Sequence, residues 1–226
     1  MTGLIILWTA ALGACVGSFT NVVVWRLPRR ESVVHPGSHC PRCGHAIRWH
    51  DNIPVFGWLL LGGRCRDCQS TISWRYPAVE ALSSLLWCSA LLVGLNGGGN
   101  LPSQWLPWAG FPLIGLLLPL TLIDLDHLWL PEPLCRWGLV VGLLISSAGG
   151  ITLWSNHLIA AIAGLLALEG ISALGEKALG QPALGLGDAK LAALGGAWLG
   201  GAGLTMALGL AVLIGALVGS LGRLSG

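Results

Sequence analysis

The chain has 226 residues, of which 54% are hydrophobic and 10% are charged, and its mean hydropathy is +0.74. Because a soluble domain carries about 25% charged residues, this composition excludes a protein that faces water over most of its surface. The net charge is only +2, so the distribution of the charges along the chain is more informative than their sum.

The apolar stretches predict an all-α polytopic membrane protein with about seven spans and a range of six to eight. A helix that crosses a bilayer needs roughly 17–25 apolar residues, and such stretches lie near 4–25, 78–95, 105–123, 134–151, 157–175, 189–202 and 203–222. Glycines at 200, 201 and 203 leave open a turn or a kink between the last two. The first stretch lacks the basic start and the cleavage site of a signal peptide, so we interpret it as a permanent span.

We divide the chain into a first span, 1–25, a long polar segment, 26–76, and a third part, 77–226, which holds the remaining spans and the candidate peptidase core. The polar segment holds eight of the 12 basic residues, namely Arg26, Arg29, Arg30, Arg42, Arg48, Arg64, Arg66 and Arg75. The connections at 96–104 and 146–155 contain none. Because basic loops stay in the cytoplasm, we expect the polar segment to be cytoplasmic and the N-terminus to lie outside. Counting spans from there places Asp124 and the loop 176–188 on the cytoplasmic side.

The polar segment also contains two CxxC pairs, Cys40 with Cys43 and Cys65 with Cys68. Two such pairs are typical of a four-thiolate zinc site, and a metal would stabilise a segment too small and too charged to build a core. The alternatives are disulfides, which a cytoplasmic location disfavours, and four free thiols. His39 and His45 lie beside the first pair and are substitute ligands. The sequence therefore predicts a structural zinc ribbon with the four cysteines as ligands.

A charged side chain within a membrane span has a high free-energy cost, so acidic residues within or beside apolar spans suggest a function. They are Asp124, Asp126, Glu132, Glu169 and Asp188. Residues two apart on a helix point about 200° apart, so Asp124 and Asp126 cannot both face one partner, whereas Asp124 and His127 share a face. Asp188 follows glycines at 185 and 187, and its alternative role is that of a helix cap.

Two carboxylates at one membrane edge suggest an acid–base pair. Two such groups in a low-dielectric site do not both ionise readily, so one keeps a proton while the other acts as a base. The base would activate water, and the protonated partner would polarise a peptide carbonyl. We therefore expect Asp124 and Asp188 to act together as an aspartic peptidase, with His127 as a hydrogen-bond neighbour and Glu169 bonded to a neighbouring helix.

Several short motifs occur in a fixed order along nearly the whole chain. They are 17–22 (GSFTNV), 26–28 (RLP), the two CxxC pairs, 52–54 (NIP), 63–65 (GRC), 75–77 (RYP) with Glu80, 123–127 (IDLDH) and 185–190 (GLGDAK). On these motifs the chain resembles the bacterial prepilin leader peptidases, which serve type IV pili and type II secretion. One departure is Glu132, which stands where the Leu-Pro-Asp of the family has aspartate.

This resemblance implies that Asp124 and Asp188 are catalytic. It implies substrates that are membrane-inserted prepilins or pseudopilins, cut at the cytoplasmic face of the bacterial inner membrane after a basic leader ending in glycine. Family members with the cysteine segment usually also methylate the new amino terminus with S-adenosylmethionine. Membrane lipid is the other expected partner, and nucleic acid is not expected.

The residues show no standard binding motif for a methyl donor. The polar segment is too short for a doubly wound nucleotide-binding domain and lacks its glycine fingerprint. We expect a site shared between this segment and the span ends, with Asn21 and Glu80 as candidates. Both have ordinary alternatives, as a packing residue and as a helix-start acid.

Three other readings of the chain are a presenilin-like protease, a proton-coupled transporter and a membrane-anchored zinc-ribbon adaptor. The first shares the GxGD element, but it usually has tyrosine where this chain has Ile123. The second would use Asp124 and Glu169 as relay acids, but we find no internal repeat. The third leaves Asp124 and Asp188 unexplained.

Overall fold

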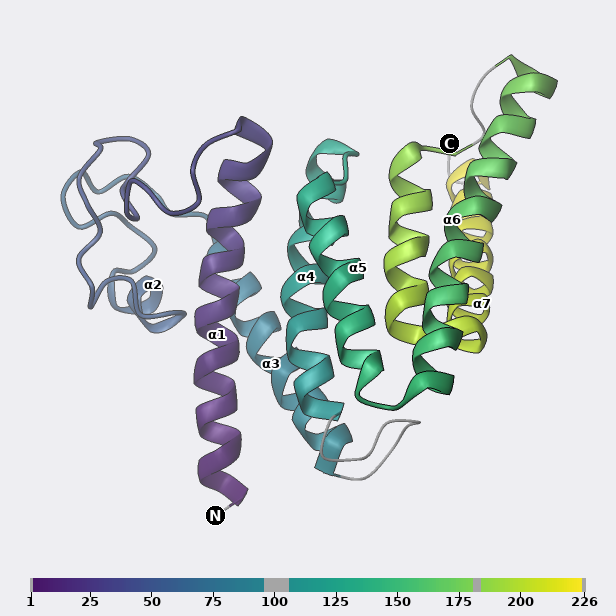
Figure 1. Cartoon of the computed structure of the whole chain (residues 1–226). Coiled ribbons are helices and arrows are strands. Elements are labelled where there is room, and N and C mark those ends of the chain that lie inside the picture. The colour runs from purple at the N-terminus through teal and green to yellow at the C-terminus, as the bar shows by residue number, and fades with distance from the viewer. Residues whose placement is uncertain (1, 96–105, 181–183, 225–226) are drawn as a thin grey trace. The chain divides into compact units, whose positions relative to one another are not determined.

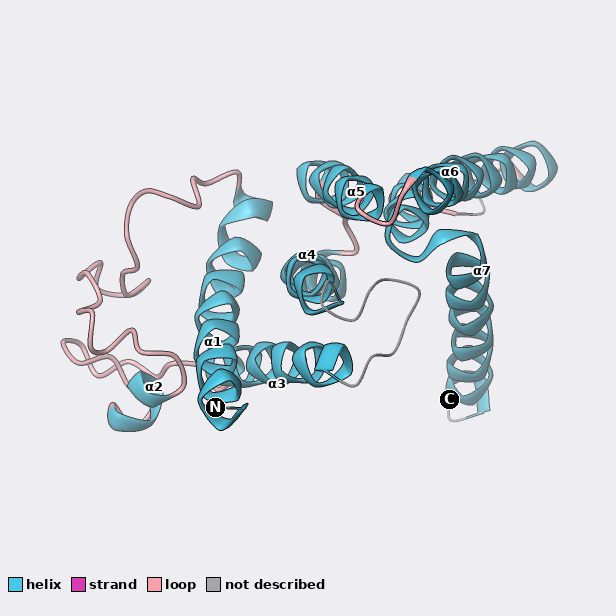
Figure 2. Cartoon of the chain, turned by 60° about the horizontal axis from the view of Figure 1, so that its bottom comes forward, coloured by secondary structure: helices cyan, strands magenta, loops and turns pink. Residues whose placement is uncertain are grey.

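The computed structural model describes residues 2–95, 106–180 and 184–224, and these residues form helices and two isolated β-bridges but no strand (Figures 1 and 2). The predicted all-α membrane fold is confirmed, because five of these helices are long and apolar enough to cross a bilayer. The chain divides into two compact units, Met1–Pro131 and Glu132–Gly226. The predicted connection at 96–104 lies outside the described residues.

Three long helices, α1 (Thr2–Arg26), α3 (Arg75–Leu95) and α4 (Leu106–His127), pack together in the first unit. Glycines on α1 let the α3 backbone approach closely. A Cβ atom on Gly17 would lie 2.7 Å from the Cα atom of Glu80 and 2.8 Å from the Cβ atom of Ser83. Small residues at such crossings are typical of membrane helices, so this crossing brings the candidate Glu80 against α1.

The polar segment between α1 and α3 is mostly irregular, with the short helices η1 (Leu27–Arg29) and α2 (Phe56–Leu60). Each CxxC pair lies within a tight turn that is closed by one β-bridge, His39 with Ala46 and Arg64 with Thr71. The two turns have the same construction, in which the backbone N–H of the first cysteine donates a hydrogen bond to a carbonyl five residues later. Cys40 N–H donates to His45 O at 2.9 Å, and Cys65 N–H donates to Ser70 O at 2.8 Å.

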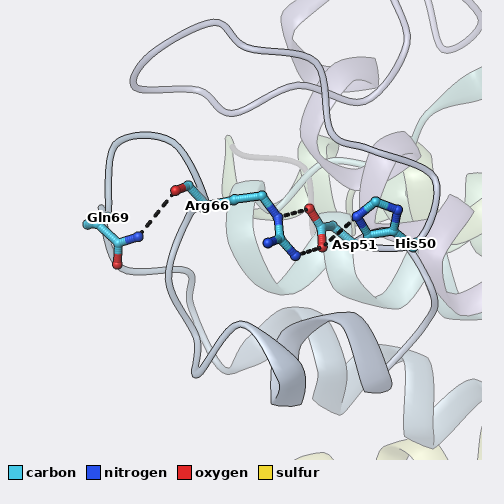
Figure 3. A network of polar contacts seen from close by, with 4 residues as sticks. All are labelled: His50, Asp51, Arg66 and Gln69. Atoms are coloured by element: carbon cyan, nitrogen blue, oxygen red, sulfur yellow. Dashed lines mark hydrogen bonds and ion pairs between the residues drawn. The ribbon is translucent and has the colours of Figure 1, made fainter.

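A polar network fixes the second of these turns to the loop before α2 (Figure 3). Arg66 donates two hydrogen bonds to Asp51, from Nε at 2.7 Å and from Nη2 at 2.6 Å. Gln69 Nε2 donates to the carbonyl of Arg66 at 3.2 Å, and His50 Nε2 lies 3.6 Å from Asp51. The Arg66 guanidinium holds the pKa of the Asp51 carboxyl below its usual value. This bidentate pair was not predicted from the sequence.

The second unit contains α5 (Glu132–Ser147), α6 (Ile151–Leu179) and α7 (Leu186–Leu224). The helix α5 has 16 residues and ends before the predicted boundary at 151, because Gly150 adopts a φ of 90°, which favours glycine. It is not among the five long apolar helices. Sixteen helical residues rise only about 24 Å, so a crossing by α5 requires local thinning of the bilayer or flanking side chains that reach the interface.

The helix α7 is interrupted at Gly200, where φ is 66° and ψ is −175°. The two pieces run in opposite directions in Figure 1, and Asn156 of α6 fixes the turn by accepting a hydrogen bond from the Gly201 N–H at 2.9 Å. A Cβ atom at Gly200 would lie 2.5 Å from the side-chain oxygen Oδ1 of Asn156. The alternative that the sequence left open is thus resolved as a turn, which matches the two predicted stretches 189–202 and 203–222.

Candidate functional site

The four cysteines of the polar segment form one cluster. Their sulfur atoms all lie within 4.8 Å of one another, with 3.8 Å between Cys40 and Cys68 and 4.0 Å between Cys43 and Cys65. Four sulfurs about 2.3 Å from a tetrahedral zinc ion would stand about 3.8 Å apart, so the arrangement fits zinc. A disulfide needs about 2.05 Å, and all seven cysteines are free.

The protonation of these thiols differs around the cluster. Backbone hydrogen bonds, the largest at Cys43, lower the pKa of Cys40 to about 6. The hydroxyl of Ser70, 3.1 Å from its sulfur, lowers the pKa of Cys68. At Cys43 the backbone bond from His45 acts in the lowering direction, but burial and the neighbouring thiols outweigh it and raise the pKa to about 12. The lowered pKa values of Cys40 and Cys68 act in the direction of the thiolate, which is the form that binds metal.

A cavity of about 810 Å³ lies beside the cysteine cluster in the first unit. Its wall comes from the polar segment and from the ends of α1, α3 and α4, and both candidates, Asn21 and Glu80, line it. Asn21 Nδ2 donates to the Tyr76 carbonyl at 3.1 Å, and Glu80 Oε2 accepts from the Val55 N–H at 2.7 Å. Both side chains therefore also have an ordinary structural role, because each binds a backbone group of a neighbouring segment.

The end of α4 separates Asp124 from Asp126. Asp126 lines the cavity and is held by Arg75, whose two terminal nitrogens donate to its two carboxylate oxygens at 3.0 Å and 2.6 Å. Asp124 is exposed, and its carboxylate forms no hydrogen bond or ion pair with any described residue. One acid of the DxDH segment is thus committed to an arginine and the other is available, as the helix spacing suggested. His127 also lines the cavity.

Asp188 lies in the first turn of α7 and is exposed. Its carboxylate accepts a hydrogen bond from the Gly185 N–H at 3.1 Å, which makes it a cap of this helix. The alternative role considered for Asp188 is therefore present. One carboxylate accepts about four hydrogen bonds, so capping leaves most of its capacity for other partners.

Residues of α5 and α6 also contact the beginning of α7. Ser172 of α6 donates to the Leu184 carbonyl at 2.8 Å, and Lys190 lies 3.4 Å from the carboxylate of Glu132 on α5. Arg136 also bonds Glu132, at 2.8 Å. The Glu132–Lys190 pair was not predicted from the sequence, where its only signal is that both residues lie in motifs of the family. Glu169 is exposed on α6 and bonds no other described side chain.

Among the predicted residues, the structure brings the four cysteines together and places Asn21 and Glu80 around one cavity. Asp124 belongs to the first unit and Asp188 to the second, so their pairing stays a prediction. Four cysteine sulfurs are enough to coordinate a tetrahedral ion, so the cluster needs no histidine ligand. His39, one of the two substitute ligands, instead contacts the Gly37 carbonyl through Nδ1 at 3.0 Å.

Comparison with known proteins gives two family matches. Residues 11–93 match the "Bacterial Peptidase A24 N-terminal domain", and residues 111–220 match the "Type IV leader peptidase family". Similar curated proteins are prepilin leader peptidase/N-methyltransferases. That of Myxococcus xanthus is 38% identical over 215 residues, that of Aeromonas salmonicida 38% over 232, and that of Pseudomonas aeruginosa 37% over 237.

These alignments cover 93%, 90% and 95% of this chain. They cover 61% of the Myxococcus protein, 76% of the Aeromonas protein and 79% of the Pseudomonas protein, so the chain is similar to only part of each relative. No solved structure gives a significant match.

Proposed function

We propose that this chain, which belongs to the type IV leader peptidase family, cleaves the leader of type IV prepilins or type II secretion pseudopilins and methylates the exposed amino terminus. The observation that carries the proposal is the match of both parts of the chain to this family, together with its multi-pass apolar helices. The expected location is the bacterial cytoplasmic membrane, with the active site facing the cytoplasm.

In the proposed peptidase site, Asp124 and Asp188 form the catalytic pair. One carboxylate removes a proton from water, and the oxygen of that water attacks the carbonyl carbon of the peptide bond after the leader. The protonated partner donates a hydrogen bond to the carbonyl oxygen, where negative charge develops. The proton then passes to the leaving amine, and the C–N bond breaks.

Chain connectivity supports a common membrane face for the two acids. The helix α4 ends at His127 and α5 begins at Glu132, and the few residues between them are far too short to cross a bilayer of about 30 Å. Within the second unit, Glu132 in turn contacts Lys190, two residues after Asp188. The connection between α4 and α5 therefore stays at one membrane face, and the charge distribution along the chain assigns both acids to the cytoplasmic face.

For the methyltransferase activity, the proposed site is the cavity between the polar segment and the helix ends. Its volume of about 810 Å³ lies within the range of small-ligand pockets, about 300–1,000 Å³. S-adenosylmethionine would supply an electrophilic methyl group there. Glu80 is placed to accept hydrogen bonds from ribose hydroxyls, a role that acidic residues have in other nucleotide sites. Trp58 and Tyr76 also line the cavity and offer aromatic surface to a base.

The proposed zinc site has a structural role beside this cavity. Four protein ligands leave no open coordination position, which is typical of structural zinc. Cys40 and Cys65 themselves line the cavity, so a metal at the cluster would hold one wall of the methyl-donor site.

The experiment that tests the proposed function is reconstitution of the purified full chain in lipid with a prepilin and labelled S-adenosylmethionine. The expected result is a shorter pilin that carries label on its new amino terminus. A chain that transports protons across the same vesicles without cutting the prepilin would support the transporter reading instead. Adding pre-cleaved pilin to a parallel sample measures methylation independently of cleavage.

A substitution at Glu80 separates the two proposed activities. Glu80→Gln keeps an acceptor for the Val55 N–H but removes the charge, and hydrogen bonds to charged groups contribute about 1.5–3 kcal/mol. We expect methylation of pre-cleaved pilin at limiting methyl donor to fall roughly 10- to 150-fold, while the rate of cleavage stays within about threefold. Glu176→Gln, an exposed acid in the other unit, is the matched control. Unchanged methylation in Glu80→Gln would remove Glu80 from the site.

A further inference from the structure

We infer that Lys190 and Glu132 form a positioning pair that fixes Asp188 for catalysis. The inference rests on the proposed catalytic role of Asp188 and goes beyond it, because it assigns a function to the acid that departs from the family motif and to the lysine that follows the GxGD element. Neither residue is proposed to touch the substrate.

The pair joins two helices at the level of Asp188. Lys190 Nζ lies 3.4 Å from Glu132 Oε1, and Glu132 is the first residue of α5 while Lys190 lies in the first turns of α7. Both side chains are partly exposed, 41% for Lys190 and 49% for Glu132. Such an exposed pair contributes little to overall stability, so its expected effect is on local geometry.

The same face of α7 is anchored to α5 further along the helix. Trp198 Nε1 donates to the Gly138 carbonyl at 2.8 Å, and a Cβ atom on Gly142 would lie 2.7 Å from the Trp198 ring. Cys135, between Glu132 and Gly138, is only 3% exposed. These contacts hold α5 against α7 near Trp198. The Lys190–Glu132 pair adds a contact between the same two helices near the end of α7 that carries Asp188.

The chain just before Asp188 has its own restraint. Ser172 of α6 donates to the Leu184 carbonyl, and the Asp188 carboxylate caps the Gly185 N–H. The segment from Leu184 to Asp188 is thus held by α6 on one side, and the turn that follows is held by α5 through Lys190. A carboxylate on a short glycine-containing turn needs such restraints, because glycine has high backbone freedom and a misplacement of about 1 Å can cost about 100-fold in rate.

Arg136 provides an internal control for this assignment. It also bonds Glu132, at 2.8 Å, but it lies four residues further along the same helix. Removing Arg136 breaks an ion pair of Glu132 without loosening α7 from α5. Removing Lys190 breaks the pair that crosses between the helices.

The test is prepilin cleavage by the full chain in lipid, with kcat and KM measured for Lys190→Met, Glu132→Gln, the double variant and Arg136→Gln. We expect kcat to fall about tenfold in each of the first two, with KM and the thermal unfolding temperature nearly unchanged. The double variant should be no slower than either single one, because both remove the same interaction. Arg136→Gln should keep kcat within about twofold, and Lys190→Arg should restore most of the lost rate.

Three results would overturn the inference. They are full activity of Lys190→Met, additive losses in the double variant, and an equal loss in Arg136→Gln. Methylation of pre-cleaved pilin, measured in the same samples, should be unchanged, and a parallel loss there would indicate general damage instead of positioning. Asp188→Asn is assayed alongside: if it still cleaves, the catalytic role of Asp188 on which the inference rests fails, whereas an inactive Asp188→Asn with a fully active Lys190→Met contradicts the positioning role alone.

Discussion

Replacing either Asp124 or Asp188 with asparagine is expected to lower leader cleavage by about 10²–10⁴-fold, the contribution of a positioned general acid or base. Asparagine has nearly the shape of aspartate but cannot accept or deliver the proton. Because the two acids act on one water and one carbonyl, the double variant should be scarcely worse than either single variant. The measurement is release of the leader from a reconstituted prepilin.

Asp126→Asn is the matched control for Asp124→Asn. The two residues lie two apart on α4, but Asp126 is bound by Arg75, and that ion pair is partly exposed, 41% on Arg75 and 30% on Asp126. Loss of such a pair costs about 1 kcal/mol or less, so cleavage should remain within about tenfold. Cleavage that survives in Asp124→Asn and disappears in Asp126→Asn would reverse the assignment.

Because Asp188 also caps α7, the thermal unfolding temperature must be measured together with the rate of cleavage. The side-chain oxygen of asparagine at this position can still accept the hydrogen bond from the Gly185 N–H, so Asp188→Asn should leave the thermal unfolding temperature nearly unchanged. A purely structural Asp188 predicts that this variant keeps its activity. A catalytic Asp188 predicts a stable but inactive protein.

Removing metal from the cysteine cluster is expected to unfold the polar segment and abolish methylation. Structural zinc contributes apparent binding free energies of about 10–16 kcal/mol in zinc-finger peptides, and this segment has little regular structure of its own, with helices of three and five residues. The purified protein should contain one zinc per chain by elemental analysis. After chelation, limited proteolysis should cut within 26–76, while the helical signal of the spans remains.

Substitution separates the cluster from the other cysteines. Cys43→Ser with Cys65→Ser should lose the metal and reproduce the effect of chelation, because it removes one ligand from each pair. Cys15→Ser changes an exposed cysteine on α1 and should retain one zinc per chain. A cluster that holds no metal in the freshly purified protein, or methylation that survives its removal, would contradict this role.

Local sequence patterns determined the helices and the cysteine site of this protein. Hydrophobicity over about twenty residues sets a span wherever the stretch occurs, so the predicted stretches match α1, α3, α4, α5, α6 and the two pieces of α7. The paired CxxC spacing likewise brings thiols together through two short turns. The helical period alone separated Asp124 from Asp126.

The tertiary structure decided which polar groups are partners, because those contacts join residues that are distant along the chain. Arg75 and Asp126 are 51 residues apart, and neither has a local pattern that identifies the other. The same holds for Lys190 with Glu132 and for the cavity that gathers Asn21 and Glu80 from two helices. Folding of the chain sets these distances, since side-chain contacts between helices depend on how the helices pack.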